Sequence, residues 1–542
     1  MLPLDHDIGR AKALIIDSNP TARSVMAAQL RDLGVPQVRQ MSRVQDARLV
    51  LEESPHDIVL CEMSFAGAPM SGQDLLDELR RENLLPFSTA FILVTGEATY
   101  AQVMEAAEAT VDGYLVKPYS GAVLAERLTE VRRRKRALSP IYAAIQSGEF
   151  LRAAALAEAR FDARESYWTF AAQLATELWL RADQPQRAIR VCSAFVAEKP
   201  QAWAKAGIAR ARFAMGELAA ARRQLESVVA EHADYADAHD LLGRVQVELG
   251  EFAHALDSFR AAADLTPGCL LRLQHRGTLA FYQGHKREAL QCIERAISMG
   301  RKSKLFEPAC LMLLGLLRFD LRDPRGVAST LQQIEHLRES QPQSRRLERI
   351  IRLMRGLIAV QARRPDEAVS IARELAAGVM DPGYDLEAAS LTIAMWVRLP
   401  TGEVPLKEFD TLLRAAAMRF CVSKASTEML AASTDEVASA AETIRNCHGV
   451  ITHAAEEALN LSLSGQAAAA VERLLQQGGQ THNAKLIEMA GAVAHRQARH
   501  MPDVASVDQR VKQLQAAFCP PLTTIAGVRR TGRMPGGVVL RT

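Results

Sequence analysis

The chain has 542 residues, of which 48% are hydrophobic and 24% charged, as is usual for a globular protein of several domains. The formal net charge of +3 gives no reason to expect nucleic acid or a membrane surface as the main partner. Aromatic residues make up only 5%, and no apolar run reaches the roughly 18 residues of a membrane span, which argues against an extended all-β architecture and a transmembrane helix.

The cysteines and the first residues indicate the compartment. The eight cysteines form no C-x-x-C pair and show no zinc-ligand spacing, and several occupy apolar helix positions. Residues 1–7 lack the basic and apolar segments of a secretory signal. We therefore expect reduced thiols and a cytoplasmic location.

The first 138 residues alternate between strand patterns and helix patterns. Continuous apolar runs indicate strands buried on both faces of a parallel sheet. These runs, with a weaker one at residues 37–41, lie at 12–17, 57–63, 91–95 and 113–116. Helical spacing occurs at 20–33, 73–82 and 98–109. Units of this length predict an α/β doubly wound sheet with its ligand site beyond the carboxyl ends of the strands.

Polar side chains follow the predicted strands where such a site requires them. Asp17 ends the first strand, Glu62 ends the second long run, and Thr95 ends the third. Lys117 follows the last strand, and Pro118 favours an extended conformation for it. Because carboxyl ends of parallel strands share one edge, we expect two acids, a hydroxyl and an ammonium group to converge there.

Residues 12–138 resemble a bacterial response-regulator receiver domain. Five pieces match in order and spacing: IIDSNP (15–20), DIVLCEM (57–63), MSG (70–72), ILVTGEA (92–98) and DGYLVKPY (112–119). The resemblance implies a flavodoxin-like fold over residues 10–138. It also implies two adjacent acids and an aspartate that hold Mg²⁺, with phosphorylation of that aspartate by a histidine kinase.

The sequence departs from the family at two positions that would bind Mg²⁺ and accept the phosphoryl group. Ser18 stands at the position of the second acid, and Glu62 stands at the phosphoacceptor position. The resemblance assigns the retained Thr95, Tyr114 and Lys117 to the sensing switch. Asp17 and Glu62 remain as a weak Mg²⁺ site, because Mg²⁺ needs near-octahedral oxygen ligation and Ser18 supplies no carboxylate. Phosphoryl transfer depends on the position of the acceptor oxygen, so the longer side chain of Glu62 is expected to reduce it.

Three hypotheses for Glu62 follow from these departures. Its carboxylate imitates a phosphoryl group and holds the domain partly activated, it pairs with Lys117 in an inert site, or it is still phosphorylated. The first two describe a pseudo-receiver. The basic run at 132–136, which closes this section, is interpreted as the solvated end of a helix entering a linker, with phosphate binding as the alternative.

The rest of the chain repeats with a period of 34 residues. Gly216, Gly250 and Gly284 keep this step, and so do the alanines at 221, 255 and 289. The pattern resembles the tetratricopeptide repeat, a helix–turn–helix unit that stacks into an all-α solenoid. We expect these repeats over residues 139–400, degenerate repeats or a cap over 401–500, and a disordered tail over 519–542.

The family resemblance also places a peptide-binding groove on the first helix of each unit. The groove positions include three aromatic side chains and two arginines, namely Trp203, Arg210, Phe213, Arg244 and Phe281. An aromatic side chain beside arginines is a plausible anchor for a partner segment. The alternative is that Trp203 and Phe213 pack between neighbouring units.

These observations predict a non-enzymatic adaptor of two-component type. No phosphate-binding loop, zinc-protease motif or serine-hydrolase elbow is present in the sequence. The expected partners are proteins bound by the repeat groove and the receiver output face, among them a histidine kinase, rather than membranes or nucleic acid. The competing hypothesis is a functional phosphorelay regulator whose phosphorylation gates the groove.

Overall fold

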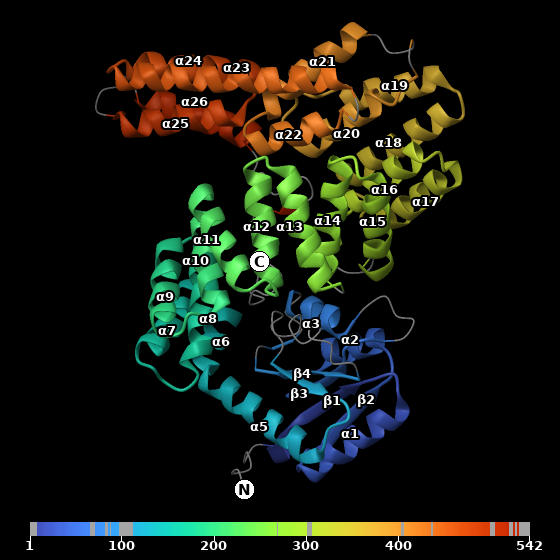
Figure 1. Ribbon diagram of the computed structural model, residues 1–542, viewed down its shortest axis with the longest axis vertical. Coiled ribbons are helices and arrows are strands. Elements are labelled where there is room, and N and C mark those ends of the chain that lie inside the picture. The colour runs from blue at the N-terminus through green and yellow to red at the C-terminus, as the bar shows by residue number, and fades with distance from the viewer. Residues whose placement is uncertain are drawn as a thin grey trace.

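The computed structural model describes residues 8–65, 71–81, 85–86, 88–96, 112–267, 269–300, 306–400, 402, 406–434, 437–498, 504–519, 524–525 and 528–529. Two parts follow each other along the chain, a parallel sheet with flanking helices and a long all-helical region (Figure 1). This confirms the predicted α/β domain followed by an all-α solenoid. The helix predicted at residues 98–109 lies outside the described residues, as does Met70 of the MSG motif.

Within the described residues, the N-terminal sheet has five parallel strands in the order β2-β1-β3-β4-β5. They are β1 Lys12–Ile16, β2 Gln37–Met41, β3 Ile58–Glu62, β4 Ala90–Thr95 and β5 Gly113–Val116. Helices α1 Pro20–Asp32, α2 Val44–Glu53, α3 Gly72–Arg81 and α5 Gly121–Ala137 accompany them, after a short 3-10 turn at Ile8–Arg10.

The strands form where the sequence is apolar on both faces. Residues of β1, β3 and β4 divide between two buried clusters, one on each side of the sheet. The α1 helix starts at Pro20, whose missing N–H is no loss at a helix start. The side chain of Asn19 accepts hydrogen bonds there from the backbone N–H groups of Thr21 and Ala22. This cap fixes the path of the chain directly after Asp17.

In the part of the chain that the structure describes, ten helices follow in consecutive packed pairs. They are α6 Ser139–Gln146, α7 Phe150–Asp162, α8 Trp168–Arg181, α9 Pro185–Glu198, α10 Ala202–Ala214, α11 Leu218–Glu231, α12 Ala236–Glu248, α13 Phe252–Leu265, α14 Leu270–Tyr282 and α15 Lys286–Gly300. Three glycines of the 34-residue register, Gly216, Gly250 and Gly284, have φ of +76°, +71° and +76° between the two helices of a pair. Glycine adopts this left-handed conformation without steric cost, so the register marks the turns.

The helical pattern continues to residue 518. The further helices are α16 Ala309–Asp320, α17 Pro324–Ser340, α18 Arg345–Gln361, α19 Pro365–Ala376, α20 Leu386–Trp396, α21 Leu406–Phe420, α22 Lys424–Ala432, α23 Ala438–Leu463, α24 Ala467–Thr481, α25 Ala484–Arg496 and α26 Val504–Phe518. In the tail predicted to be disordered, β6 Thr524–Ile525 pairs with β7 Val528–Arg529. The expected disorder therefore does not extend to these four residues, because their backbone groups pair with each other.

The helical region curves, and a late segment returns to an early one (Figure 1). Helix α22 contacts α12, far from it in the sequence. A buried chain of hydroxyl groups joins the hydroxyl of Tyr282 to Ser390 at 3.3 Å and Ser390 to Ser433 at 2.7 Å. The repeats from α12 to α14 are therefore covered in part by the chain itself.

Candidate functional site

The polar residues predicted at the sheet edge gather there. Asp17 follows β1, Glu62 ends β3, Thr95 ends β4 and Lys117 follows β5. The backbone N–H of Lys117 donates to the carbonyl of Thr95 at 2.7 Å, which continues the β4–β5 pairing to the pocket. Asp17 and Thr95 are buried. The parallel register brings residues that are far apart in the sequence to one edge of the sheet, and this cluster of side chains is called the Lys117 pocket below.

Lys117 is the centre of the pocket. Its ammonium donates a hydrogen bond to Asp17 Oδ2 at 2.6 Å and another to Glu62 Oε2. The second oxygen of Asp17 accepts from the backbone N–H of Asn19 at 2.7 Å. Two clustered carboxylates therefore share one ammonium group.

The shifts in pKa follow from burial and these contacts. Burial raises the pKa of Glu62 and Asp17 adds to this, although the hydrogen bond from Lys117 acts against it. Burial opposes the charged ammonium of Lys117, but its hydrogen bonds to Asp17 and Glu62 outweigh burial and raise its pKa. Burial, and then the charges of the two acids, raise the pKa of Tyr119 to about 12. Lys117 is therefore charged at neutral pH.

The residues of this pocket fit Mg²⁺ poorly. Mg²⁺ demands octahedral oxygen ligation, usually from carboxylates and water. Asp17 and Glu62 supply two carboxylates, but Lys117 already binds both of them. Ser18 contributes no further charge. Among the described residues no group of three or more His, Cys, Asp or Glu side chains is placed to hold a metal ion.

Backbone packing fixes the position of Glu62. Gly72, the first residue of α3, lies so close that an added Cβ would stand 2.3 Å from the Glu62 carbonyl oxygen and 2.9 Å from Cys61 Sγ. The hydroxyl of Tyr114, the predicted switch aromatic, lies 4.0 Å from the sulfur of Met63 on the same edge. The backbone of Glu62 is therefore packed tightly against the start of α3.

The basic run at the end of α5 is solvated only in part. Lys135 and Arg134 are only 6% and 12% exposed, and both meet the carboxylate of Asp112, at 2.5 and 3.6 Å. Arg134 also donates to the Asp112 carbonyl at 2.6 Å. The prediction of a solvated end was wrong for these two residues, because Asp112 lies beside them in the fold. Sequence reasoning missed the pairing of Asp112 with these two cations, because only the packing of α5 beside the start of β5 brings them together.

The predicted groove residues are packed within the repeats. Trp203 meets Phe195 edge-on at 4.6 Å between ring centroids, and Arg210 pairs with Glu177. Arg244 is 5% exposed, and its guanidinium lies 5.9 Å from the ring of Phe213.

Phe281 is half-buried and contacts Tyr282 edge-on at 5.4 Å. Each of the five groove candidates thus has neighbours within the repeats, and the aromatic ones are not freely exposed.

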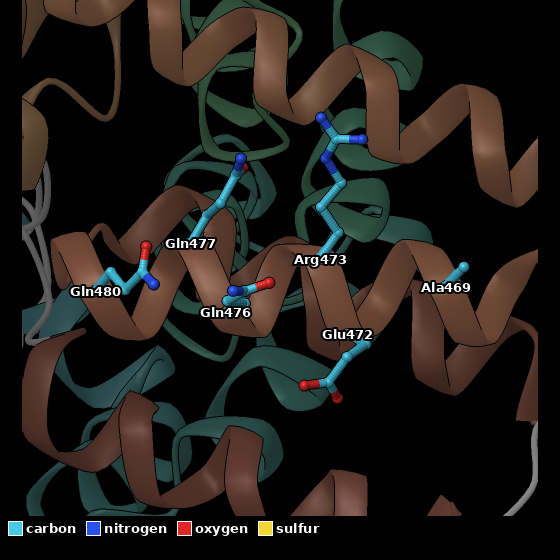
Figure 2. A pocket seen from close by; sticks show the side chains of 6 residues that line it. All are labelled: Ala469, Glu472, Arg473, Gln476, Gln477 and Gln480. Carbon is cyan, nitrogen blue, oxygen red and sulfur yellow. The ribbon is translucent and has the colours of Figure 1, made fainter.

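A separate hollow of ≈ 520 Å³ lies along α24 and is lined by polar side chains. Figure 2 shows Arg473 and Glu472 pointing to opposite sides of this helix. Arg473 pairs with Glu457 of α23 at 2.5 Å, and Glu472 pairs with Arg510 of α26 at 2.9 Å. These ion pairs join the last helices to each other. No helix within the described residues combines the length and the apolar character needed to cross a bilayer.

Comparisons with known proteins agree with the two-part fold. The family model for the response regulator receiver domain matches residues 13–129, and a tetratricopeptide repeat model matches residues 207–268. The chemotaxis protein CheY-3 of Vibrio cholerae serotype O1 is 34% identical over 123 residues, which are 23% of this chain and 92% of that protein. The chemotaxis protein CheY of Pseudomonas aeruginosa is 33% identical over 123 residues, which are 23% of this chain and 97% of that protein.

Two solved structures match this chain at low overall similarity. MamA has a TM-score of 0.26 at 22% identity and covers 31% of this chain and 97% of its own. A tetratricopeptide repeat protein from Parabacteroides merdae has a TM-score of 0.34 at 12% identity and covers 51% and 97%. The assignment itself rests on the family models and on the relatives that are more than 30% identical. By these matches the chain belongs to the response-regulator family, as a receiver domain fused to tetratricopeptide repeats.

Proposed function

We propose that this chain is a signalling adaptor in which a pseudo-receiver is joined to repeats that bind other proteins. Receiver domains and tetratricopeptide repeats both mediate protein–protein contacts, and their fusion supports a role in two-component signalling. The proposal assigns the receiver role to residues 10–138, partner binding to 139–400 and a capping role to 401–500. It places the protein in the cytoplasm and makes a histidine kinase a candidate partner.

The ion pair between Lys117 and Glu62 is the observation that carries the pseudo-receiver proposal. The Glu62 carboxylate accepts from the ammonium at the position from which a phosphoryl group would be bound. Ser18 removes a carboxylate that would attract Mg²⁺, and the extra methylene of glutamate shifts the acceptor oxygen by about 1 Å, enough to cost on the order of 100-fold in rate. In this proposal the pocket stays in one state without phosphotransfer, and the retained switch residues Thr95, Tyr114 and Lys117 stay in the conformation of that state.

Restoring the acids tests this proposal. The full chain and a Ser18→Asp, Glu62→Asp double variant are incubated with Mg²⁺ and a small phosphodonor, and intact mass is measured. We expect one added phosphoryl group on the double variant only, mapping to position 62. A Ser18→Asp, Glu62→Gln variant is the matched control, because it has the added acid but no acceptor. A phosphoryl adduct on Glu62 of the natural chain would support the functional phosphorelay regulator instead.

The partner-binding half has its own test. Phe281 is half-buried on the first helix of its unit, so its truncation removes a candidate anchor. Phe281→Ala in the full chain is compared with the natural chain for binding to an isolated partner, with helix content measured by circular dichroism. Lost binding with unchanged helix content supports the groove, and unchanged binding argues against Phe281 as an anchor.

A further inference from the structure

Strand β5 is held at both of its ends. At its carboxyl end, Lys117 bonds to the Thr95 backbone and to the acids of the pocket. At its amino end, the carboxylate of Asp112 accepts from the backbone N–H of Phe91 at 3.0 Å. The strand has only four residues and lies at the edge of the described sheet, where it pairs with β4 alone.

The amino end of β5 is tied to α5 by buried charges. Asp112 binds Lys135 Nζ at 2.5 Å, and the two side chains are 8% and 6% exposed. Charged groups buried to this degree are stable only when they stay paired, so a displacement of Asp112 carries Lys135 with it. Gly113 reinforces the contact, since a Cβ there would stand 3.2 Å from a methyl group of Val131 on α5.

Helix α5 belongs to both parts of the molecule. Leu124, Leu128 and Val131 pack in the core of the receiver. Leu138 alone separates α5 from α6. Leu138 is fully buried in a hydrophobic cluster that also contains Ile141 and residues of the helices from α7 to α10. Figure 1 shows α5 running from the sheet directly to α6. The connection is a packed helix junction rather than a flexible linker.

The two cations that hold Asp112 also touch the first helices of the repeats. Lys135 Nζ lies 5.1 Å from the centre of the Tyr142 ring on α6, and the Arg134 guanidinium lies 4.3 Å from the centre of the Phe170 ring on α8. A cation over an aromatic face is attracted to it, more strongly when water is excluded. The same side chains therefore bind the receiver strand and the repeat helices.

We propose that Asp112, Lys135 and Arg134 form an intramolecular bridge through which the state of the Lys117 pocket is transmitted to helices α6–α8. A change at Glu62 or Lys117 shifts β5, Asp112 moves with the strand, and the two cations transfer the displacement to Tyr142 and Phe170. This inference rests on the proposed function in one respect only, because it takes the state held by the Lys117 pocket as the signal that the repeats receive. It adds the route by which the repeats sense that site.

Hydrogen exchange of the full chain, followed by mass spectrometry of peptides from residues 139–181, tests the bridge. Glu62→Gln serves as the pocket change, because it removes a charge while keeping the side-chain size. We expect this change to speed exchange in α6–α8 by roughly fivefold or more, the lower end of ordinary coupling between sites. In a Lys135→Met background the same pocket change has no further effect on α6–α8. Arg133→Met is the matched control, because Arg133 lies on the same helix at 48% exposure.

Two results would overturn the bridge. One is unchanged exchange in α6–α8 after Glu62→Gln, and the other is an equal response with and without Lys135. If Lys135→Met unfolds the receiver, as fast exchange in β1 and β3 would show, Asp112→Asn replaces it, because its amide oxygen still accepts from the Phe91 N–H. No phosphodonor is used, so a failed pseudo-receiver proposal leaves this result standing, and a failed bridge leaves the phosphorylation result standing.

Discussion

Lys117 donates a hydrogen bond to Glu62 across the edge of the sheet, although 55 residues separate the two in the sequence. Asp17 accepts from the same ammonium at 2.6 Å and is 1% exposed. One lysine thus holds together the ends of three strands. The pocket is a structural element as well as a candidate signalling site, because removing the cation leaves two carboxylates facing each other without compensation.

Lys117→Met is therefore expected to destabilise the receiver. Breaking a fully buried pair costs about 3–5 kcal/mol, and the 26% exposure of the Lys117 side chain reduces the expected loss to about 2 kcal/mol. Thermal unfolding of the full chain, followed by calorimetry, measures the change in the receiver transition. Adding Glu62→Gln to this variant removes one uncompensated charge and restores part of the loss. An unchanged transition would show that the ion pair contributes no stability.

Gly72→Ala tests how tightly Glu62 is positioned. The new methyl group would stand 2.3 Å from a backbone oxygen, which cannot move aside as a flexible side chain does. Overpacking of this kind costs about 1–3 kcal/mol. We expect a loss in that range in denaturant unfolding of the receiver. Gly9→Ala is the control, because nothing lies within 4 Å of a Cβ at that position. Equal stability of the two variants would contradict the close contact.

The sequence predicted the pocket because its geometry follows from strand order. Residues 37–41 and 113–116 form strands with the expected bounds, and side chains at the carboxyl ends of parallel strands share one edge. The pairing of Lys135 with Asp112 was not predictable in this way. The run at 132–136 has the composition of a solvated helix end, and only the packing of α5 beside the start of β5 buries it. The burial of Arg244 likewise depends on tertiary packing around α12, which no local pattern encodes.

Gly243 lies where the two helices of one repeat unit pack closely, and a larger residue there is expected to destabilise the repeats. A Cβ on Gly243 of α12 would stand 2.7 Å from the ring of Phe259 on α13, so this glycine permits the two helices of the pair to meet. Gly243→Ala is expected to cost about 1–3 kcal/mol in denaturant unfolding. Gly449→Ala, inside α23 with nothing within 4 Å, is expected to stabilise by about 0.5–1 kcal/mol because alanine favours a helix. The same sign for both variants would refute the role of Gly243 in close packing.

The lowered pKa of Glu288 makes the stability of the repeats depend on pH. Hydrogen bonds from Arg260, at 3.0 and 2.6 Å, lower its pKa to about 2 despite partial burial, and Arg276 adds a further bond at 2.8 Å. Because the folded pKa lies below the unfolded value of 4.5, this carboxylate stabilises the fold above pH 4.5, and the contribution is lost as the pH falls towards 2.

Glu288→Gln should therefore lower stability at pH 7 by about 1–2 kcal/mol, a value reduced for the solvent that reaches the pair. For a repeat region of this length, this corresponds to a decrease in Tm of roughly 1–3 °C. The difference between variant and natural chain should shrink as the pH is lowered from 4.5 towards 2, because the natural carboxylate then becomes protonated as well. Glu339→Gln, at a side chain 74% exposed, is the control and should change Tm little at either pH. A difference that stays constant from pH 7 to pH 2.5 would show that the charge of Glu288 is not what the two arginines stabilise.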